Sequence, residues 1–459
     1  MATTRDNGLV KGLGLIDSTT LVMGSMIGSG IFIVAADIGR QVNSPGLLMM
    51  TWFVAAAMTI VAALSYGELA AAMPHAGGQY VFLREAYGPM CGFLYGWTLF
   101  LVIQTGTIAA VAVAFAKYTG IFWPLISEQK YLFGKGRLGL TTQELLAIAM
   151  VLLLSWSNTR GIRTGAVVQN VFTFAKVGAL LGLVGLGLLL GRNPAAVQAN
   201  FTDFWRNASW SWNAVRLVGV AMVGALFSSD AWNNVTFTAA EVRNPKRNLP
   251  LSLALGTGIV SALYIACNFV YLNVLPLNAI QHAAEDRVAA AAASQILGPV
   301  AVQVMAAAII VSTFGCNNGL ILAGARVSYA MAKDGVFFRR AAQVDPVHHT
   351  PRFALLVQCV WTVVLILSGS YNDLLNYVIF AALLFYILTI ASLFVLRRTQ
   401  PNLERPYRAF GYPVLPILYI AAAALIAALL LVYQPNNSWP GLIIVVLGLP
   451  VYWIWRRRA

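Results

Sequence analysis

The sequence predicts an all-α integral membrane protein with twelve transmembrane helices. Of its 459 residues, 59% are hydrophobic and only 10% are charged, whereas a soluble domain carries about 25% charged residues. The mean hydropathy is +0.74, and the apolar residues come in runs close to the roughly 20 that cross a bilayer. The predicted spans are 14–39, 46–71, 89–117, 143–159, 164–191, 213–240, 250–275, 298–330, 352–368, 373–396, 413–433 and 439–455.

The distribution of basic residues predicts the orientation of the chain. Its formal charge of +14 would suggest a nucleic acid partner in a soluble protein. With twelve spans both termini share one side, and 20 Lys and Arg fall in the loops there, against nine on the other side. The positive-inside rule then places both termini in the cytoplasm of a cell inner (plasma) membrane. Anionic lipid accounts for the basic loops, so we expect no nucleic acid partner.

Two of the predicted spans contain a short interruption that disfavours a continuous helix. The first holds GSMIGSGIF at 24–32, and the sixth holds FSSDAWNN at 227–234. They lie five helices apart, and because five is odd a second five-helix unit would enter the membrane from the opposite face. The spacing predicts a five-plus-five inverted repeat, and paired interruptions in such repeats indicate the binding site of a transporter. We therefore expect one transporter domain over 1–459, with repeats 14–191 and 213–396 and a final helix pair at 413–455.

Helix ends at mid-membrane would favour a zwitterionic ligand. Amides at a helix N-terminus carry partial positive charge, and carbonyls at a C-terminus carry partial negative charge. An α-amino acid offers both complements: its carboxylate would bind the amides of Ser29 and Gly30. Its ammonium would bind the carbonyls of Met26, Phe227 and Asp230. The alternative is that the glycines only permit close helix packing.

Two ionisable residues are predicted near the middle of the membrane. Lys176 lies 13 residues after Arg163 and 16 before Arg192, about 20 Å from one helix end. It would be a fixed cation in place of a transported sodium ion, or a proton carrier. Asp230 would contact substrate, or would only hold the break open by bonding backbone amides.

Four further residues have weaker roles. Phe227 lies beside the break and would gate the site, while Trp232 and Asn233 would line the cavity or simply pack. Glu68, near the inner end of the second span, is interpreted as a structural partner.

The motifs of enzymes and ATP-driven pumps are missing from the sequence. It contains neither GxxxxGK[ST] nor HExxH, and its four Cys form no CxxC pair. We expect no enzymatic activity, cofactor or metal site, and energy that comes from gradients or exchange.

Four stretches of the sequence, two of which hold the interruptions, resemble the amino acid–polyamine–organocation (APC) superfamily, and within it bacterial homologues of the L-type amino acid transporter (LAT) branch. The stretches are GSMIGSGIF, 65–89, 227–250 and 312–338, and the resemblance covers nearly the whole chain. It implies the LeuT-type fold, with discontinuous first and sixth helices, and sodium-independent amino acid exchange by alternating access. It also implies carboxylate binding by Ser29 and Gly30, a fifth-helix lysine at Lys176 and an aromatic gate at Phe227.

The chain departs from the family pattern at two places. A Gly often precedes the Trp of the sixth helix, whereas here Ala231 precedes Trp232, which leaves less backbone freedom. Animal members are disulfide-linked to a heavy subunit, but residues 118–142 contain no Cys. We expect a stand-alone carrier of small or medium neutral L-amino acids. The alternatives are a proton-coupled symporter, a carrier of cationic amino acids or polyamines, and a channel or sensor.

Overall fold

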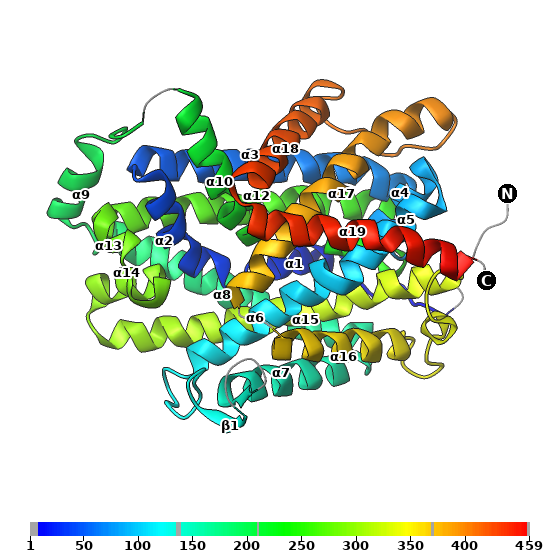
Figure 1. Ribbon diagram of the computed structural model, residues 1–459, viewed down its shortest axis with the longest axis horizontal. Helices are drawn as coiled ribbons and strands as arrows, with labels where there is room; N and C mark the ends of the chain where they lie inside the picture. Colours follow the sequence, from blue (N-terminus) through cyan, green and yellow to red (C-terminus); the bar gives the residue numbers. More distant parts are fainter. Residues whose placement is uncertain (1–7, 135–138, 209–210, 369–370, 457–459) are drawn as a thin grey trace.

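The computed structural model describes residues 8–134, 139–208, 211–368 and 371–456, and over these it is almost entirely helical (Figure 1). The one sheet described is a short antiparallel pair, with Tyr131 opposite Thr141 and Phe133 opposite Leu140. The two chain ends, for which the sequence predicts a cytoplasmic position, lie outside the described residues.

The helices follow one another with few long loops. In chain order the α-helices and strands are α1 (Leu15–Met26), α2 (Gly30–Val42), α3 (Pro45–Ala72), α4 (Gln79–Tyr87), α5 (Pro89–Thr98), α6 (Gln104–Thr119), β1 (Tyr131–Phe133), β2 (Leu140–Thr141), α7 (Thr142–Asn158), α8 (Ile162–Leu189), α9 (Pro194–Phe201), α10 (Trp212–Ser228), α11 (Asn234–Phe237), α12 (Pro245–Val274), α13 (Leu277–Gln281), α14 (Val288–Leu297), α15 (Val300–Lys333), α16 (Arg352–Ser368), α17 (Tyr371–Thr399), α18 (Val414–Tyr433) and α19 (Pro435–Arg456). A π-helical turn, Leu99–Ile103, joins α5 to α6, and short 3₁₀ turns lie at Ala239–Glu241, Ala284–Asp286 and Arg339–Ala342.

Local sequence explains several of the helix starts. Ser44 caps α3, whose first residue is Pro45, and a proline at this position loses no intrahelical hydrogen bond. Thr141 and Glu144 form a reciprocal capping box at the start of α7. The Ser, Thr and Pro residues at these positions therefore set where these apolar helices begin.

A helix lies at each of the twelve predicted spans. Within the described residues, nine helices are long and apolar enough to cross a membrane. The helices at the fourth, sixth and ninth predicted spans, α7, α10 and α16, have 17 residues each, fewer than the roughly 20 of a full crossing. The all-α membrane fold is confirmed, and the count of twelve crossings stays a prediction.

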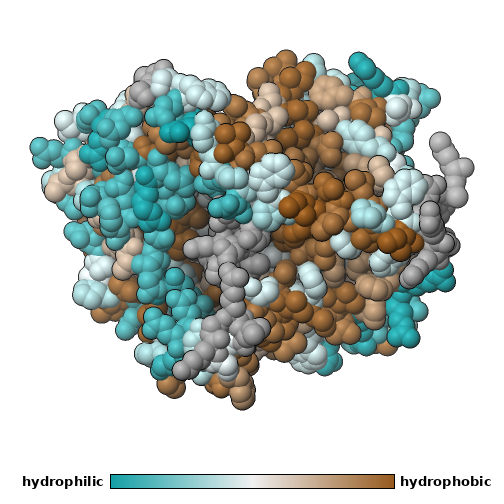
Figure 2. Space-filling model, viewed as in Figure 1, coloured by the Kyte–Doolittle hydropathy of each residue, from teal (hydrophilic) through white to brown (hydrophobic). Residues whose placement is uncertain are grey.

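The surface matches the surroundings that such helices need. Figure 2 shows hydrophobic residues exposed over the middle and right of the molecule and hydrophilic residues gathered at the left end. Large apolar side chains such as Phe174, Val304 and Leu447 are more than half exposed. Because a water-soluble protein rarely exposes large continuous apolar areas, this exposed hydrophobic region is the lipid-facing surface.

The interrupted helices lie inside the bundle. The helix α1 packs against α8, α12 and α15, while α2 packs against α10. In the most apolar 18-residue stretch of Leu15–Val42, 89% of residues are buried, against 28% in the corresponding stretch of α8. The interior position matters because non-helical backbone at membrane depth persists only where protein or a cavity surrounds it.

A buried ion pair fixes the segment that follows the sixth-span interruption. Arg326 on α15 donates to both carboxylate oxygens of Glu241, at 2.8 and 3.1 Å, and both side chains are at most 1% exposed. The backbone carbonyl of Glu241 also accepts from the amides of Gly12 and Leu13. The start of the chain is thereby tied to the same segment.

A second buried carboxylate holds the linker before the last helix pair. Glu68 on α3 accepts from Arg397 at 3.0 and 2.7 Å and from the amide of Ala409 at 2.7 Å. Arg405 lies 3.4 Å from the same carboxylate. The interpretation of Glu68 as a structural partner is confirmed.

We predict that Arg326→Met destabilises the protein by about 3–5 kcal/mol, because it leaves the Glu241 carboxylate buried without its partner. The measurement is the thermal unfolding midpoint in detergent, which should fall by several degrees. The matched control is Lys246→Ala, whose partner Glu404 is exposed, and an exposed pair contributes at most about 1 kcal/mol. Equal midpoints for the two variants would contradict this interpretation.

Candidate functional site

The first interruption lies where the sequence predicts it. The helix α1 ends at Met26 and α2 begins at Gly30, with Ile27, Gly28 and Ser29 between them. Ile27 leaves the helical conformation, with φ −76° and ψ 89°. Met26 therefore lies at a helix C-terminus, and Ser29 and Gly30 lie at a helix N-terminus, as the hypothesis of zwitterion binding requires.

The second interruption is also present, and it has an unusual backbone conformation. The helix α10 ends at Ser228, and the next helical residue is Asn234, which begins the short α11. Between them Ala231 has φ +63°, a left-handed conformation that costs an L-residue with a Cβ about 1–2 kcal/mol. The missing glycine thus leaves this turn in place, but the turn is strained.

The two interruptions touch each other. A Cβ atom built on Gly30 would lie 2.9 Å from the Cα of Ser228 and 2.8 Å from its Cβ. Only glycine allows the start of α2 to approach the end of α10 so closely. Gly30 has a packing role in addition to any role in binding, and the two interruptions form a single site.

The carbonyls at the ends of α1 and α10 share one donor. The hydroxyl of Tyr264, on α12, lies 3.1 Å from the carbonyl oxygen of Met26 and 3.0 Å from that of Ser228. Tyr264 is 1% exposed. The sequence analysis missed this residue, although a tyrosine in an apolar span requires a hydrogen-bond partner and could have been considered for that reason.

Lys176 crosses from α8 to the first interruption. Its ammonium donates to the carbonyls of Gly24 at 2.6 Å, Ile27 at 2.7 Å and Ser312 at 3.3 Å. The Ser312 hydroxyl in turn lies 3.1 Å from the carbonyls of Ile27 and Gly28. Lys176 is fully buried, and its partners are backbone oxygens.

Asp230 lies within the second interruption and is 8% exposed. Its carboxylate accepts from the Tyr386 hydroxyl on α17 at 2.5 Å. Among the residues that the structure describes, no cation lies within ion-pair distance of it. A buried carboxylate without a counter-charge is expensive, and this makes Asp230 the least balanced charge of the site.

The remaining predicted residues divide between cavity and core. Two small cavities meet at Asp230, and one of them is also lined by Asn233, whose amide donates to Gln79 at 2.8 Å. Met26, Ser29, Gly30 and Phe227 line neither of these two cavities. Trp232 lines the other cavity and also packs edge-on against Tyr66, with ring centroids 4.7 Å apart. In the described part of the chain, no three His, Cys, Asp or Glu side chains are placed to share a metal ion.

Interrupted helices that meet inside a bundle of lipid-facing helices define a secondary transporter. The chain belongs to the amino acid permease family, whose model matches residues 13–454. It is 30% identical to the serine/threonine exchanger SteT of Bacillus subtilis (strain 168), over 99% of both chains. It is 29% identical to the b(0,+)-type amino acid transporter 1 of Mus musculus, over 95% of this chain and 85% of the relative. It is 30% identical to the large neutral amino acids transporter small subunit 2 of Homo sapiens, over 98% and 82% respectively.

These relatives confirm the resemblance to the APC superfamily and its LAT branch. They are named as transporters or exchangers of amino acids. The chain is therefore a multi-pass membrane protein of amino acid transport and not an enzyme.

We predict that Gly30→Ala lowers amino acid uptake by at least about tenfold. The added methyl group would overlap Ser228, and overpacking costs about 1–3 kcal/mol, where about 1.4 kcal/mol corresponds to a tenfold change. The matched control is Gly258→Ala on α12, where a Cβ meets no atom within 4 Å. Uptake into proteoliposomes should be retained in the control, and retention in Gly30→Ala would disprove the close contact.

Proposed function

We propose that the protein exchanges small or medium neutral L-amino acids by alternating access, with the two interruptions as the substrate site. The observation that carries this proposal is the contact between Gly30 and Ser228, which brings an N-terminal and a C-terminal helix end together. The substrate carboxylate binds the amides of Ser29 and Gly30. Its ammonium binds carbonyls of Met26, Phe227 and Asp230, and Phe227 gates the site.

The position of Tyr264 is consistent with a substrate ammonium that replaces the Tyr264 hydroxyl as the donor to one of these carbonyls. A hydroxyl has one proton and can donate fully to one carbonyl at a time. The carbonyls of Met26 and Ser228 share that proton, and the Met26 carbonyl also accepts from the backbone amide of Gly28 at 2.9 Å, so more acceptor capacity is left at Ser228. An arriving ammonium would take this capacity and release Tyr264 to a single partner.

The hydrogen bonds of Lys176 support the proposal that transport does not use sodium. Unwound carbonyls in broken helices coordinate sodium in transporters of this kind. Here the ammonium of Lys176 occupies the centre of three carbonyls from α1, its following turn and α15. We propose that it is a fixed cation in place of a transported one.

The architecture we propose is a single transporter domain over 1–459 with twelve spans. The first inverted repeat covers 14–191, the second covers 213–396, and the last helix pair covers 413–455. The matching interruptions after α1 and α10 support the repeat.

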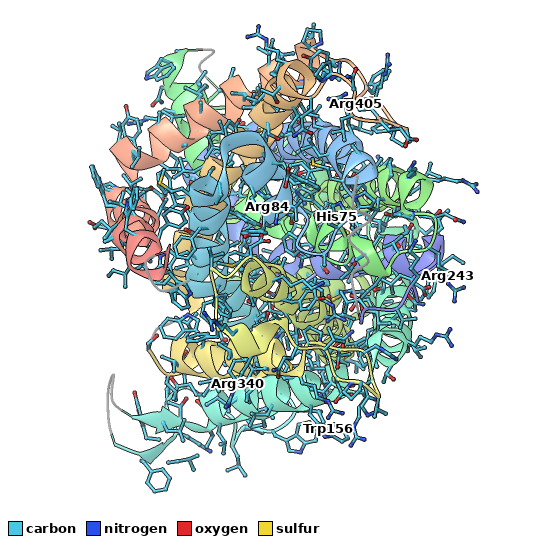
Figure 3. The ribbon with its side chains drawn as sticks, turned by 90° about the vertical axis from the view of Figure 1, so that its right-hand side faces the viewer. His75, Arg84, Trp156, Arg243, Arg340 and Arg405 are labelled. Atoms are coloured by element: carbon cyan, nitrogen blue, oxygen red, sulfur yellow. The ribbon has the colours of Figure 1, made fainter. Side chains whose placement is uncertain are left out.

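We propose that both termini face the cytoplasm of a plasma membrane. Figure 3 looks onto one end of the molecule, and Arg84, Arg243, Arg340 and Arg405 are spread across it. Basic residues at one end of the bundle fit the positive-inside rule. The four cysteines are free, and three of them are buried. Together with the absence of Cys from 118–142, this favours a carrier without a disulfide-linked heavy subunit.

Asp230 supports a second candidate function. A buried carboxylate with no cation beside it in the described residues would suit a cationic amino acid or polyamine, or a proton carried with the substrate. The relatives' names do not decide between substrates, because they range from serine and threonine to large neutral amino acids.

Counterflow in proteoliposomes separates the candidates. Vesicles preloaded with alanine should accumulate labelled alanine, equally with sodium or choline outside, and should not accumulate labelled lysine. Vesicles without internal amino acid, under an inward proton gradient, should accumulate little alanine. Lysine accumulation would establish the cationic alternative, and proton-driven accumulation without internal substrate would establish symport; either result contradicts neutral exchange.

A further inference from the structure

We propose that the polar cavity beside the second interruption receives the substrate side chain and selects for a hydroxyl group, so that the preferred substrates are small hydroxyl amino acids. The polar cavity is the one lined by Tyr95, Gln104, Thr107, Asn233 and Asn234, together with Gln79, Asp230, Tyr386 and apolar neighbours. The inference rests on the proposed function, because it takes the amino acid backbone to lie at the two interruptions.

The polar cavity adjoins the site through two of its own residues. Asp230 and Ala231 line it, and both belong to the segment between α10 and α11. Its opposite wall comes from α5, α6 and the π-helical turn between them. A side chain that leaves the substrate Cα toward this wall enters the polar cavity directly.

Most polar groups of the lining are already occupied. The amide of Asn233 donates to Gln79 at 2.8 Å. Gln104 donates to the carbonyl of Leu320 at 2.8 Å, and Thr107 donates to the carbonyl of Ile103 at 2.6 Å. These groups hold the walls together and leave little capacity for a ligand.

Two polar groups of the lining have no partner among the residues that the structure describes. The hydroxyl of Tyr95 and the Nδ2 of Asn234 are buried without a hydrogen bond to any of these residues, and each of the two residues is 1% exposed. Buried polar groups are almost always paired, and an exception requires an explanation. Both residues are also well fixed: Tyr95 packs edge-on against Phe385 at 5.3 Å, and the backbone N–H of Asn234 donates to the carbonyl of Ala231 at 3.2 Å.

The chemistry of these two groups defines what can satisfy them. An amide Nδ2 only donates, whereas a tyrosine hydroxyl both donates and accepts. A substrate hydroxyl can accept from Asn234 and donate to Tyr95, so it pairs with both. An ammonium could pair with the Asp230 carboxylate in the same lining, but it has no lone pair for Asn234. A methyl group can pair with neither Asn234 nor Tyr95.

The size of the polar cavity adds a second restriction. Its free space is close to that of one water molecule. A hydroxymethyl or hydroxyethyl group is the kind of side chain that fits with small movements of the walls. Longer amide side chains and large apolar side chains would require the walls to separate.

Threonine and valine provide a direct test, because they have nearly the same shape and differ by a hydroxyl in place of a methyl group. The wild-type protein in proteoliposomes should exchange threonine at least about tenfold better than valine, since a site that hydrogen-bonds a hydroxyl rejects the analogue without it. In Tyr95→Phe the ratio of threonine to valine exchange should fall about tenfold, the effect of one lost hydrogen bond. Asn234→Leu should lower the same ratio.

The control is Tyr329→Phe, a buried tyrosine on α15 that does not line the polar cavity, and it should keep the wild-type ratio. The inference is overturned if wild type exchanges threonine and valine equally. It is also overturned if Tyr95→Phe and Asn234→Leu both keep the wild-type ratio, because their groups then bind only water. Folded wild-type protein that exchanges no neutral amino acid would refute the proposed function and, with it, this inference.

Discussion

The structure depends on one constraint: peptide groups released by a helix break at membrane depth must find partners without bulk water. The two interruptions release carbonyls at Met26 and Ser228, and apart from the backbone amide of Gly28, which donates to Met26, the donors come from other helices. Tyr264 reaches both carbonyls from α12. Lys176 and Ser312 reach the first interruption from α8 and α15. Three surrounding helices thereby replace the hydrogen bonds that two continuous helices would have made internally.

This kind of support suits a part that has to move. Each donor holds its carbonyls by one or a few hydrogen bonds, and a hydrogen bond exchanged for another costs little net free energy. The Glu241–Arg326 pair is different, because its separation would leave two charges buried. The carbonyls at the interruptions can therefore exchange their present donors for a substrate. The segment that follows α11 is held by the Glu241–Arg326 ion pair, and both charges lose their partner together if it opens.

The sequence predicts well the features that local composition decides. Glycines at 28 and 30 and the polar run at 227–234 located both interruptions, and the position of Lys176 far from either end of its span agrees with a side chain that is fully buried. The all-α class followed from hydropathy. The departure at Ala231 was visible, but its outcome was not, because the φ of +63° reflects tertiary packing that outweighs the preference of alanine.

The sequence could not identify the partners that lie far along the chain. Tyr264 is 238 residues from Met26, and Lys176 is 152 residues from Gly24. Nothing in the pattern around Asn234 or Tyr95 distinguishes them from the other polar residues of the spans. Only the packing leaves both without a partner beside the same cavity. Such features depend on the fold, so they become visible after the helices are placed.

The most direct measurement is competition by analogues that lack one end of the zwitterion. Exchange of the best labelled amino acid would be measured against an excess of the same amino acid, its decarboxylated amine and its deaminated acid. If helix ends of both polarities hold the substrate, the amino acid competes and each analogue is at least about a hundredfold weaker, as expected when a charged hydrogen-bonding group is lost. Competition by either analogue at the strength of the amino acid would contradict the account, because one of the two helix ends would then play no part in binding.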